Sequence, residues 1–319
     1  MEQKTLQVGT LVLTLALLLR LTGAKGDLSR ELGSTLLLLS SGRVVTQTRP
    51  LPQETEATQP TTAATEPERQ AAPVFDREQE ALVQVNAAWS VDTLSLLRAP
   101  LQWDLMQEAP TVLILHTHGT ESYEKKAAYT ESSPYRTLDT GYNVVSVGDR
   151  VAEILEAGGV RVIHDRTLHD YPSYNSAYSQ ARKAISQTLK ENPSVCLVLD
   201  LHRDAVEDER GKQKGETVQV QGMEAARLML VMGSDKGALS FPDWKSNLSL
   251  AVKLQAQLEG DYPGLCRPIK LVTSRYNQDL SAGALLVEVG AAGNTLEQAL
   301  YSAELLAQGI LALAGGANT

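Results

Sequence analysis

The sequence predicts an α/β fold: a mostly parallel central sheet with helices on both faces. Two observations predict it. From residue 110 onward, short apolar runs rich in Val, Ile and Leu alternate with longer stretches of helical apolar spacing, and such alternation favours a sheet covered by helices. Residues 195–201 are apolar at nearly every position, which is typical of a parallel strand buried on both faces.

Residues 1–24 are expected to be a signal anchor or a signal peptide. Lys4 precedes an apolar run at residues 8–19, and a basic start before about a dozen apolar residues is the pattern of an export signal. The run is short for a spanning helix, which needs roughly 17–25 residues. It can be extended past Arg20, because an arginine near a helix end can reach the interface. The pattern fits both a signal anchor that is retained and a signal peptide that is cleaved.

Residues 25–75 are predicted to be a low-complexity linker rich in Pro, Thr and Glu. Between Val45 and Pro73 there are too few apolar side chains to offset the entropy of ordering the chain. Residues 76–109 are expected to form a helical lead-in, because residues 77–97 regain helical apolar spacing and predict one helix. Residues 110–319 then form the main domain.

The elements of that domain are expected in order along the chain. Strands are expected at residues 112–115, 160–163, 195–201, 269–273 and 284–289. Helices are expected at residues 143–156, 173–190, 244–258 and from Asn294 onward. Gly158 and Gly159 predict the end of the first of these helices, and Asn294 with Glu297 forms a cap-like pair at the start of the last. Residues 215–222 and 226–233 are expected to form a hairpin or two edge strands.

Charge and cysteine content exclude some classes of protein. The net charge is -9, which argues against a nucleic-acid partner because such proteins normally carry a basic face. The two cysteines, Cys196 and Cys266, are too few for a disulfide-dense scaffold or a cysteine-ligated zinc cluster. Cys196 lies in an apolar strand pattern, where a thiol acts as a small hydrophobic side chain.

Polar side chains follow the strand at residues 112–115. His118 and Glu121 are three residues apart, so a turn directs both toward one point. An imidazole and a carboxylate suit zinc, which takes histidine nitrogens and carboxylate oxygens. His116 is expected on the same strand face as His118, so it is either an alternative ligand or a residue that orients a ligand from behind.

Two further strands carry polar residues near their ends. His202 and Arg203 follow the third strand, and Glu288 interrupts the last one. Because such strand ends converge on one edge of an α/β sheet, His118, Glu121, His202 and Glu288 are expected around one cleft. Three of them would bind zinc, and the fourth would take a proton from the attacking water. The structural alternatives are a buried ion pair between Glu288 and Arg203 and histidines that are merely hydrogen bonded. Several nearby residues are weaker candidates for supporting or substrate contacts: Asp200, Asp204, His164 and His169.

At these residues the chain resembles the stage II sporulation protein P (SpoIIP) family of endospore-forming bacteria. The resemblance extends from about residue 110 to the C-terminus, and the anchor and linker also fit that family's layout. The matching stretches, in order, are residues 116–123, 136–140, 143–148, 164–175, 199–204 and 288–290, with Asn294 and Thr295.

The resemblance implies a zinc-dependent N-acetylmuramoyl-L-alanine amidase with an amidase-3-like fold. The ligands carried over are His118, Glu121 and His202, and Glu288 is the catalytic base. Family members also cut peptide cross-links and work with a lytic transglycosylase, SpoIID, in remodelling peptidoglycan during engulfment.

Residues and resemblance together predict a zinc amidase tethered to the cell membrane, with its catalytic domain on the extracytoplasmic side. Arg203 is expected to hold a substrate carboxylate or the oxyanion, because a guanidinium fork suits both. The alternatives are a zinc carboxypeptidase or endopeptidase acting on stem peptides, and a non-catalytic peptidoglycan-binding protein.

Overall fold

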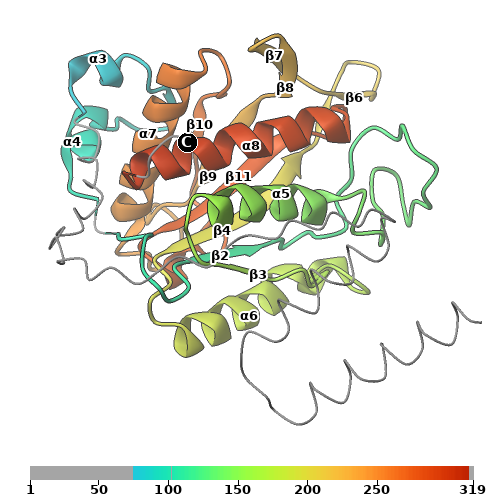
Figure 1. The fold of residues 1–319 in the computed structure, drawn as a ribbon, viewed down its shortest axis with the longest axis horizontal. Helices are drawn as coiled ribbons and strands as arrows, with labels where there is room; N and C mark the ends of the chain where they lie inside the picture. The colour runs from blue at the N-terminus through green and yellow to red at the C-terminus, as the bar shows by residue number, and fades with distance from the viewer. Residues whose placement is uncertain (1–74, 102, 316–319) are drawn as a thin grey trace, which may run out of the picture. The chain divides into compact units, whose positions relative to one another are not determined.

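The computed structural model describes residues 75–101 and 103–315 (Figure 1). The expected anchor at residues 1–24 and all but the last residue of the expected linker lie outside the described residues. Among the residues that are described, no helix combines the length and the hydropathy that crossing a membrane requires.

The centre of the fold is a seven-stranded sheet in the order β1-β10-β9-β11-β4-β2-β3 (Figure 1). Its strands are β1 (Val85–Asn86), β2 (Val112–Leu115), β3 (Val162–His164), β4 (Leu197–Asp204), β9 (Leu228–Met232), β10 (Ile269–Leu271) and β11 (Ala284–Ala291). Neighbouring strands are parallel except β9 and β11, which are antiparallel. The predicted mainly parallel sheet is therefore confirmed.

Helices cover both faces of the sheet. Helices α5 (Val144–Ala157), α7 (Trp244–Asp261) and α8 (Leu296–Leu313) lie on one face, and α6 (Ala177–Glu191), preceded by the short 3-10 helix η1 (Tyr174–Ser176), lies on the other (Figure 1). Helix α5 begins at Asn143, whose side chain accepts a hydrogen bond from Val145 N–H. Helix α8 is capped by Thr295 and Gln298, so the expected cap at Asn294 and Glu297 is wrong by one position.

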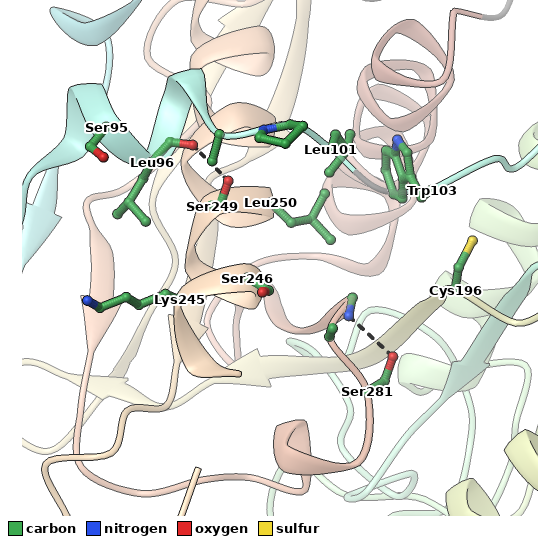
Figure 2. Close-up of a pocket in the computed structure, with 14 residues that line it drawn as sticks. Ser95, Leu96, Leu101, Trp103, Cys196, Lys245, Ser246, Ser249, Leu250 and Ser281 are labelled. Atoms are coloured by element: carbon green, nitrogen blue, oxygen red, sulfur yellow. Dashed lines mark hydrogen bonds between the residues drawn. The ribbon is translucent and has the colours of Figure 1, made fainter. Parts of the chain in front are cut away.

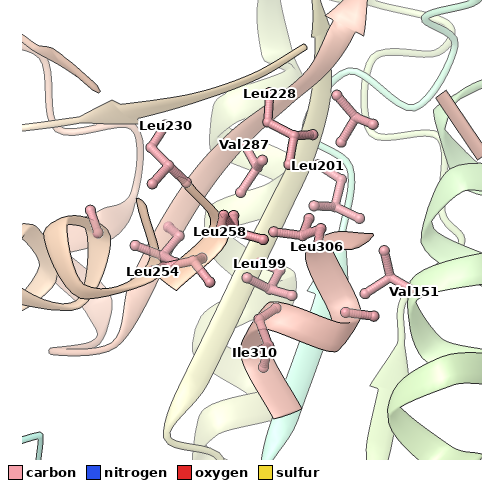
Figure 3. Packing of buried hydrophobic residues seen from close by; sticks show 14 of the residues in the cluster. Val151, Leu199, Leu201, Leu228, Leu230, Leu254, Leu258, Val287, Leu306 and Ile310 are labelled. Carbon is pink, nitrogen blue, oxygen red and sulfur yellow. The ribbon is translucent and has the colours of Figure 1, made fainter. Parts of the chain in front are cut away.

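The core follows from the two-residue alternation of the strands. One set of strand side chains packs beneath α5, α7 and α8: Val112, Ile114, Leu197, Leu199, Leu201, Leu228, Leu230 and Val287. Figure 3 shows the last five of these among side chains of the covering helices. The intervening positions Leu113, Leu115 and Val198 pack with Ala181 and Ile185 of α6. Strands apolar at every position therefore need helices on both sides, as the sequence predicts.

The lead-in differs from the expected single helix at residues 77–97. It consists of α3 (Arg77–Glu80), strand β1 and α4 (Thr93–Arg98). Val85 pairs with Ile269 at the edge of the sheet, and Ile269 N–H donates to Gln84 O at 2.7 Å. The strand is fixed by this distant partner, which local apolar spacing does not reveal.

The stretch at residues 215–233 also differs from the expectation. β7 (Thr217–Val220) forms a hairpin with β8 (Met223–Ala226), whereas β9 lies inside the main sheet between β11 and β10. A second small hairpin joins β5 (Val206–Glu207) and β6 (Gln213–Lys214). An apolar run buried by neighbouring strands and an apolar edge strand have the same local pattern, so only pairing distinguishes them.

Candidate functional site

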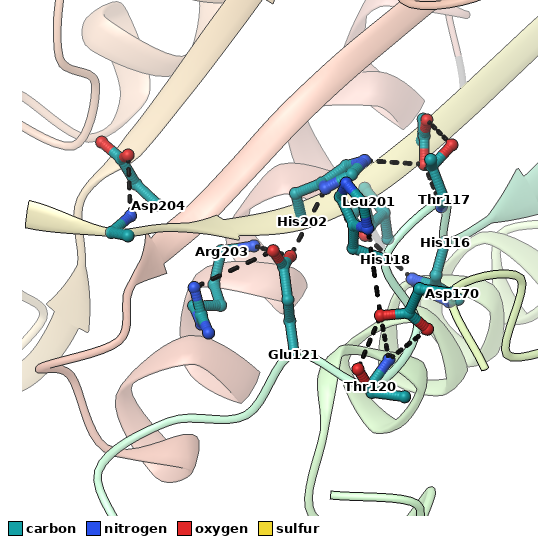
Figure 4. A network of polar contacts seen from close by, with 12 residues as sticks. His116, Thr117, His118, Thr120, Glu121, Asp170, Leu201, His202, Arg203 and Asp204 are labelled. Atoms are coloured by element: carbon teal, nitrogen blue, oxygen red, sulfur yellow. Dashed lines mark hydrogen bonds and ion pairs between the residues drawn. The ribbon is translucent and has the colours of Figure 1, made fainter. Parts of the chain in front are cut away.

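The turn after β2 brings two expected ligands to one side (Figure 4). Strand β2 ends at Leu115, and Glu121 N–H donates to His118 O at 3.1 Å, which closes the turn. The buried Tyr123 hydroxyl donates to Val289 O at 3.0 Å and ties this segment to β11. The turn expected from the spacing of His118 and Glu121 is confirmed.

His202 and Glu288 lie side by side on neighbouring strands. β4 continues to Asp204, so His202 lies within the strand rather than after it. Glu288 on β11 is its register partner in the parallel ladder. The register shifts between Glu288 and Ala291, where Gly290 has φ 71°, a conformation that glycine adopts without steric cost.

His118, Glu121 and His202 meet at this end of the sheet (Figure 4). The His118 and His202 ring centroids are 5.5 Å apart with an interplanar angle of 80°. His202 Nδ1 lies 3.4 Å from Glu121 Oε2. All three residues are buried, so their charges act on one another with little screening by water.

The electrostatics of the cluster follow from burial and proximity. Burial lowers the pKa of His202, but the Asp200 and Glu121 carboxylates outweigh it and raise that pKa well above its usual range. Burial raises the pKa of Glu288, and the negative charge of Glu121 raises it further against the opposing effect of His202. Glu288 Oε2 is buried without a hydrogen-bond partner in the described structure. The Glu288 carboxyl therefore stays protonated to a higher pH than an ordinary glutamate.

Asp200 supports His202 from behind. Its Oδ1 lies 3.0 Å from His202 Nε2, and it accepts hydrogen bonds from Thr117 N–H at 2.8 Å and from the Thr117 hydroxyl at 2.6 Å. A carboxylate at Nε2 leaves Nδ1, the nitrogen nearer Glu121, available as a ligand.

Asp170 and Arg136 complete the network and were not among the expected site residues. Asp170 Oδ2 lies 3.9 Å from His118 Nδ1, and its side chain has 0% exposure. Arg136 pairs with Asp170 at 2.8 Å and with Glu121 at 3.5 Å, so it connects the two carboxylates. The signal available in the sequence was that both residues fall within stretches that resemble the SpoIIP family.

Arg203 is placed beside Glu121 and not beside Glu288. Its Nε and Nη2 donate to the carbonyls of Ser122 and Tyr135, and Nη1 lies 3.8 Å from Glu121 Oε1. The described ion pairs include none between Arg203 and Glu288, so that structural alternative is wrong. The expected substrate contact of Arg203 stays a prediction.

The remaining histidines lie apart from the cluster. His116 is directed away from His118, toward Leu201 O and His164, so the expectation that both share one strand face is wrong. The reason is that β2 has already ended, and the two-residue alternation does not extend through the turn. His169 is buried and its Nε2 lies 3.0 Å from Asp165 Oδ2.

Two tyrosines pack against His118. The Tyr174 ring stacks on it with centroids 4.4 Å apart, and the Tyr178 ring meets it edge-on at 5.5 Å. Tyr174 is 53% exposed, so one wall of the site is an aromatic surface open to solvent.

The donor set suits zinc in its chemistry. Two ligand atoms on a tetrahedral zinc ion with bonds of about 2.1 Å are about 3.4 Å apart, which is the separation of Glu121 Oε2 and His202 Nδ1. His118 Nδ1 is buried without a hydrogen-bond partner among the described residues. No group of three or more histidine, cysteine or acidic side chains in those residues is already arranged as a complete metal site. The residues therefore match zinc in type, and Glu121 and His202 are spaced as two of its ligands would be, whereas His118 does not form one ligand group with them in the described structure.

A separate pocket of about 520 Å³ lies at the other end of the strands (Figure 2). Its lining includes Cys196 and Gly283, which precede β4 and β11, together with Trp103 and Lys245. It shares no residue with the cluster around His202, so this pocket and the candidate site are distinct.

The fold and the cluster define a class: an α/β protein with a histidine and carboxylate site where parallel strands end. The sequence profile of the stage II sporulation protein P family matches residues 36–311. The chain belongs to this family. A stage II sporulation protein P from Bacillus subtilis (strain 168) is 30% identical over 200 residues, which cover 59% of this chain and 47% of that protein. The chain thus spans about half the length of that relative.

Solved structures with similarity to this chain include two amidases. The CwlD amidase from Clostridioides difficile, solved with the GerS lipoprotein, has a TM-score of 0.40 and 16% identity over 63% of this chain and 94% of its own. The N-acetylmuramyl-L-alanine amidase Ami1 from Mycobacterium smegmatis has a TM-score of 0.39 and 16% identity over 66% of this chain and 99% of its own.

Proposed function

We propose that this protein is a zinc-dependent N-acetylmuramoyl-L-alanine amidase. It hydrolyses the amide between the lactyl group of the glycan strand and the stem peptide. The observation that carries the proposal is the meeting of His118, Glu121 and His202 beside Glu288, at the strand ends of a protein that belongs to the SpoIIP family.

His118, Glu121 and His202 would hold the ion. A zinc ion there would polarise the scissile carbonyl and lower the pKa of the attacking water. Glu288 accepts a proton from that water and passes it to the leaving amide nitrogen, so the carboxylate ends the cycle as it began. The position of Glu288 beside His202, as its register partner on β11, supports this role. Arg203 and Arg136 both pair with Oε1 of the Glu121 carboxylate.

The wider setting belongs to the same proposal. An N-terminal anchor would tether the protein to the cell membrane, with the catalytic domain outside the cytoplasm acting on peptidoglycan during engulfment. A SpoIID-like lytic transglycosylase is the expected partner, and cleavage of peptide cross-links is a second expected activity. The apolar run at residues 8–19 and the family membership support this setting.

The test uses the purified full chain loaded with zinc, on glycan strands that carry stem peptides without cross-links. An amidase releases intact stem peptides with a free L-alanine amino group, which mass spectrometry detects. Removal of zinc by a chelator, or His202→Ala, is expected to abolish release. Lys190→Met is the control, because that exposed side chain lies in the last turn of α6, outside the cluster.

Two results would overturn the proposal. Shortened stem peptides that remain attached to the glycan would identify a carboxypeptidase or endopeptidase. Tight binding to peptidoglycan with no product, in zinc-loaded protein, would identify a non-catalytic binding protein.

A further inference from the structure

His116 is a fully buried histidine that the proposed mechanism does not use. Its exposure is 0%, and its Nδ1 lies 3.0 Å from Leu201 O. Its Nε2 lies 2.9 Å from His164 Nε2. Because a carbonyl oxygen can only accept, His116 Nδ1 carries the hydrogen and donates it to Leu201. His116 Nε2 is in contact with His164 Nε2, so the two rings form a linked pair that reaches the residue before His202.

The bond to Leu201 replaces one that the sheet cannot make. β2 and β4 pair in register from Val112 and Leu197 to Leu115 and Asp200, and Leu197 N–H donates to Thr111 O. Repeating that parallel pattern every two residues would require Thr117 N–H to donate to Leu201 O. Thr117 N–H donates to Asp200 Oδ1 instead. The Leu201 carbonyl, which precedes His202 in the chain, therefore receives no hydrogen bond from the backbone of Thr117. The His116 ring supplies a hydrogen bond in its place.

The His116 ring is itself held by several segments. His164 ends β3, and its Nδ1 lies 3.1 Å from Asp149 Oδ1 on α5. Asp149 also pairs with Arg166. Gly148 leaves room for both rings, since a Cβ at that position would lie 2.6 Å from Nε2 of His116 and 2.6 Å from Nε2 of His164. Helix α5 and strand β3 thus fix the ring that binds β4.

We propose that His116, supported by His164, is a positioning residue of the site. By donating to Leu201 O it fixes the end of β4, so that His202 and its partner Glu288 face the turn that carries His118 and Glu121. The effect on zinc rests on the proposed function, whereas the effect on the order of β4 does not.

The experiment compares paired variants of the full chain with two measurements. Zinc affinity is measured by competition with a chromophoric chelator, and amide hydrogen exchange of residues 201–204 is measured in metal-free protein. His116→Ala removes the donor, whereas His116→Asn keeps a donor near the position of Nδ1. His164→Leu removes the polar contact with His116 Nε2, whereas His164→Gln keeps an amide group near that position.

His116→Ala and His164→Leu are expected to weaken zinc binding about 10- to 100-fold, the range typical of residues that orient a ligand. Both are also expected to accelerate exchange at residues 201–204 while residues 197–199 of the same strand stay protected. His116→Asn and His164→Gln are expected to restore most of both properties. Lys190→Met, at an exposed position of α6, is the control and is expected to change neither.

A folded His116→Ala with normal zinc affinity and normal exchange would overturn the proposal. So would His116→Asn behaving like His116→Ala, because the ring would then matter for packing and not as a donor. If His116→Ala does not fold, the two His164 variants decide in the same way. If the wild type does not bind zinc, the proposed function fails while the exchange measurement still tests positioning.

Discussion

Glu288 and His202 are register partners on the parallel strands β11 and β4, and this pairing fixes the proposed proton acceptor beside a proposed ligand. The relationship does not depend on a loop, because both residues lie inside strands of the central sheet. Residues far apart in the sequence are thus held at the spacing of neighbouring strands, about 4.8 Å between backbones.

Glu288→Gln is expected to lower kcat by about 10²- to 10⁴-fold, the usual contribution of a general base. Zinc affinity is expected to stay unchanged, and the free energy of unfolding is expected not to fall. The reason is that a neutral amide replaces a buried carboxylate whose Oε2 has no hydrogen-bond partner in the described structure. Kinetics on stem-peptide substrates and urea unfolding check this. Glu297→Gln, at an exposed position of α8, is the control, and full activity of Glu288→Gln would exclude the assigned role.

Arg136→Met is expected to lower the free energy of unfolding by about 3 kcal/mol, because it leaves the buried Asp170 carboxylate without its cation. Zinc affinity is expected to fall as well, since Arg136 also holds Glu121. Urea unfolding and chelator competition measure the two effects. In Lys126→Met, the control, the lost ion pair with Glu124 is exposed on both sides, so a loss below about 1 kcal/mol is expected. Equal losses in the two variants would contradict the assigned role of Arg136.

Gly148→Ala is expected to destabilise the fold by about 1–3 kcal/mol, because the added methyl group overlaps the His116 and His164 rings. Gly260→Ala is the matched helical control. Its nearest contact would be Leu82 Cδ1 at an ordinary 3.7 Å, so it is expected to stabilise by about 0.5–1 kcal/mol. Thermal unfolding of both variants distinguishes them, and a stabilising Gly148→Ala would show that α5 does not press on the histidine pair.

Lys253 gives a pH-dependent prediction. It is buried and donates to the carbonyls of Leu96 and Leu97 at the end of α4, and burial lowers its pKa from 10.5 to about 8. Between these two values the unfolded chain binds a proton that the folded chain does not, so this group makes stability rise as the pH increases from about 8 to 10.5.

Lys253→Met is expected to remove that rise and to destabilise at neutral pH by about 1–3 kcal/mol, because two carbonyls lose a donor. Urea unfolding between pH 7 and 10 is the measurement. Lys245→Met, at an exposed position of the same helix, is expected to leave the pH dependence intact. A stability gap between wild type and Lys253→Met that stays constant over this range would refute the prediction.

Strong local patterns allowed much of the fold to be predicted. The strand at residues 112–115 and the helix ending at Gly158 are confirmed, because apolar spacing and capping residues act over a few neighbouring positions. The same patterns could not place residues 85–86 or 228–232, whose neighbours in the sheet come from distant parts of the chain.

By itself the sequence determined that His118, Glu121, His202 and Glu288 follow or interrupt apolar strands, and parallel strands place such positions at one edge of a sheet. Only the tertiary structure decided that His116 is directed away from His118, that Arg203 and Arg136 hold Glu121, and that Asp170 lies behind His118. The direction of a side chain beyond the end of a strand depends on which distant groups lie close enough to bind that side chain. The local spacing of residues in the sequence does not identify those groups.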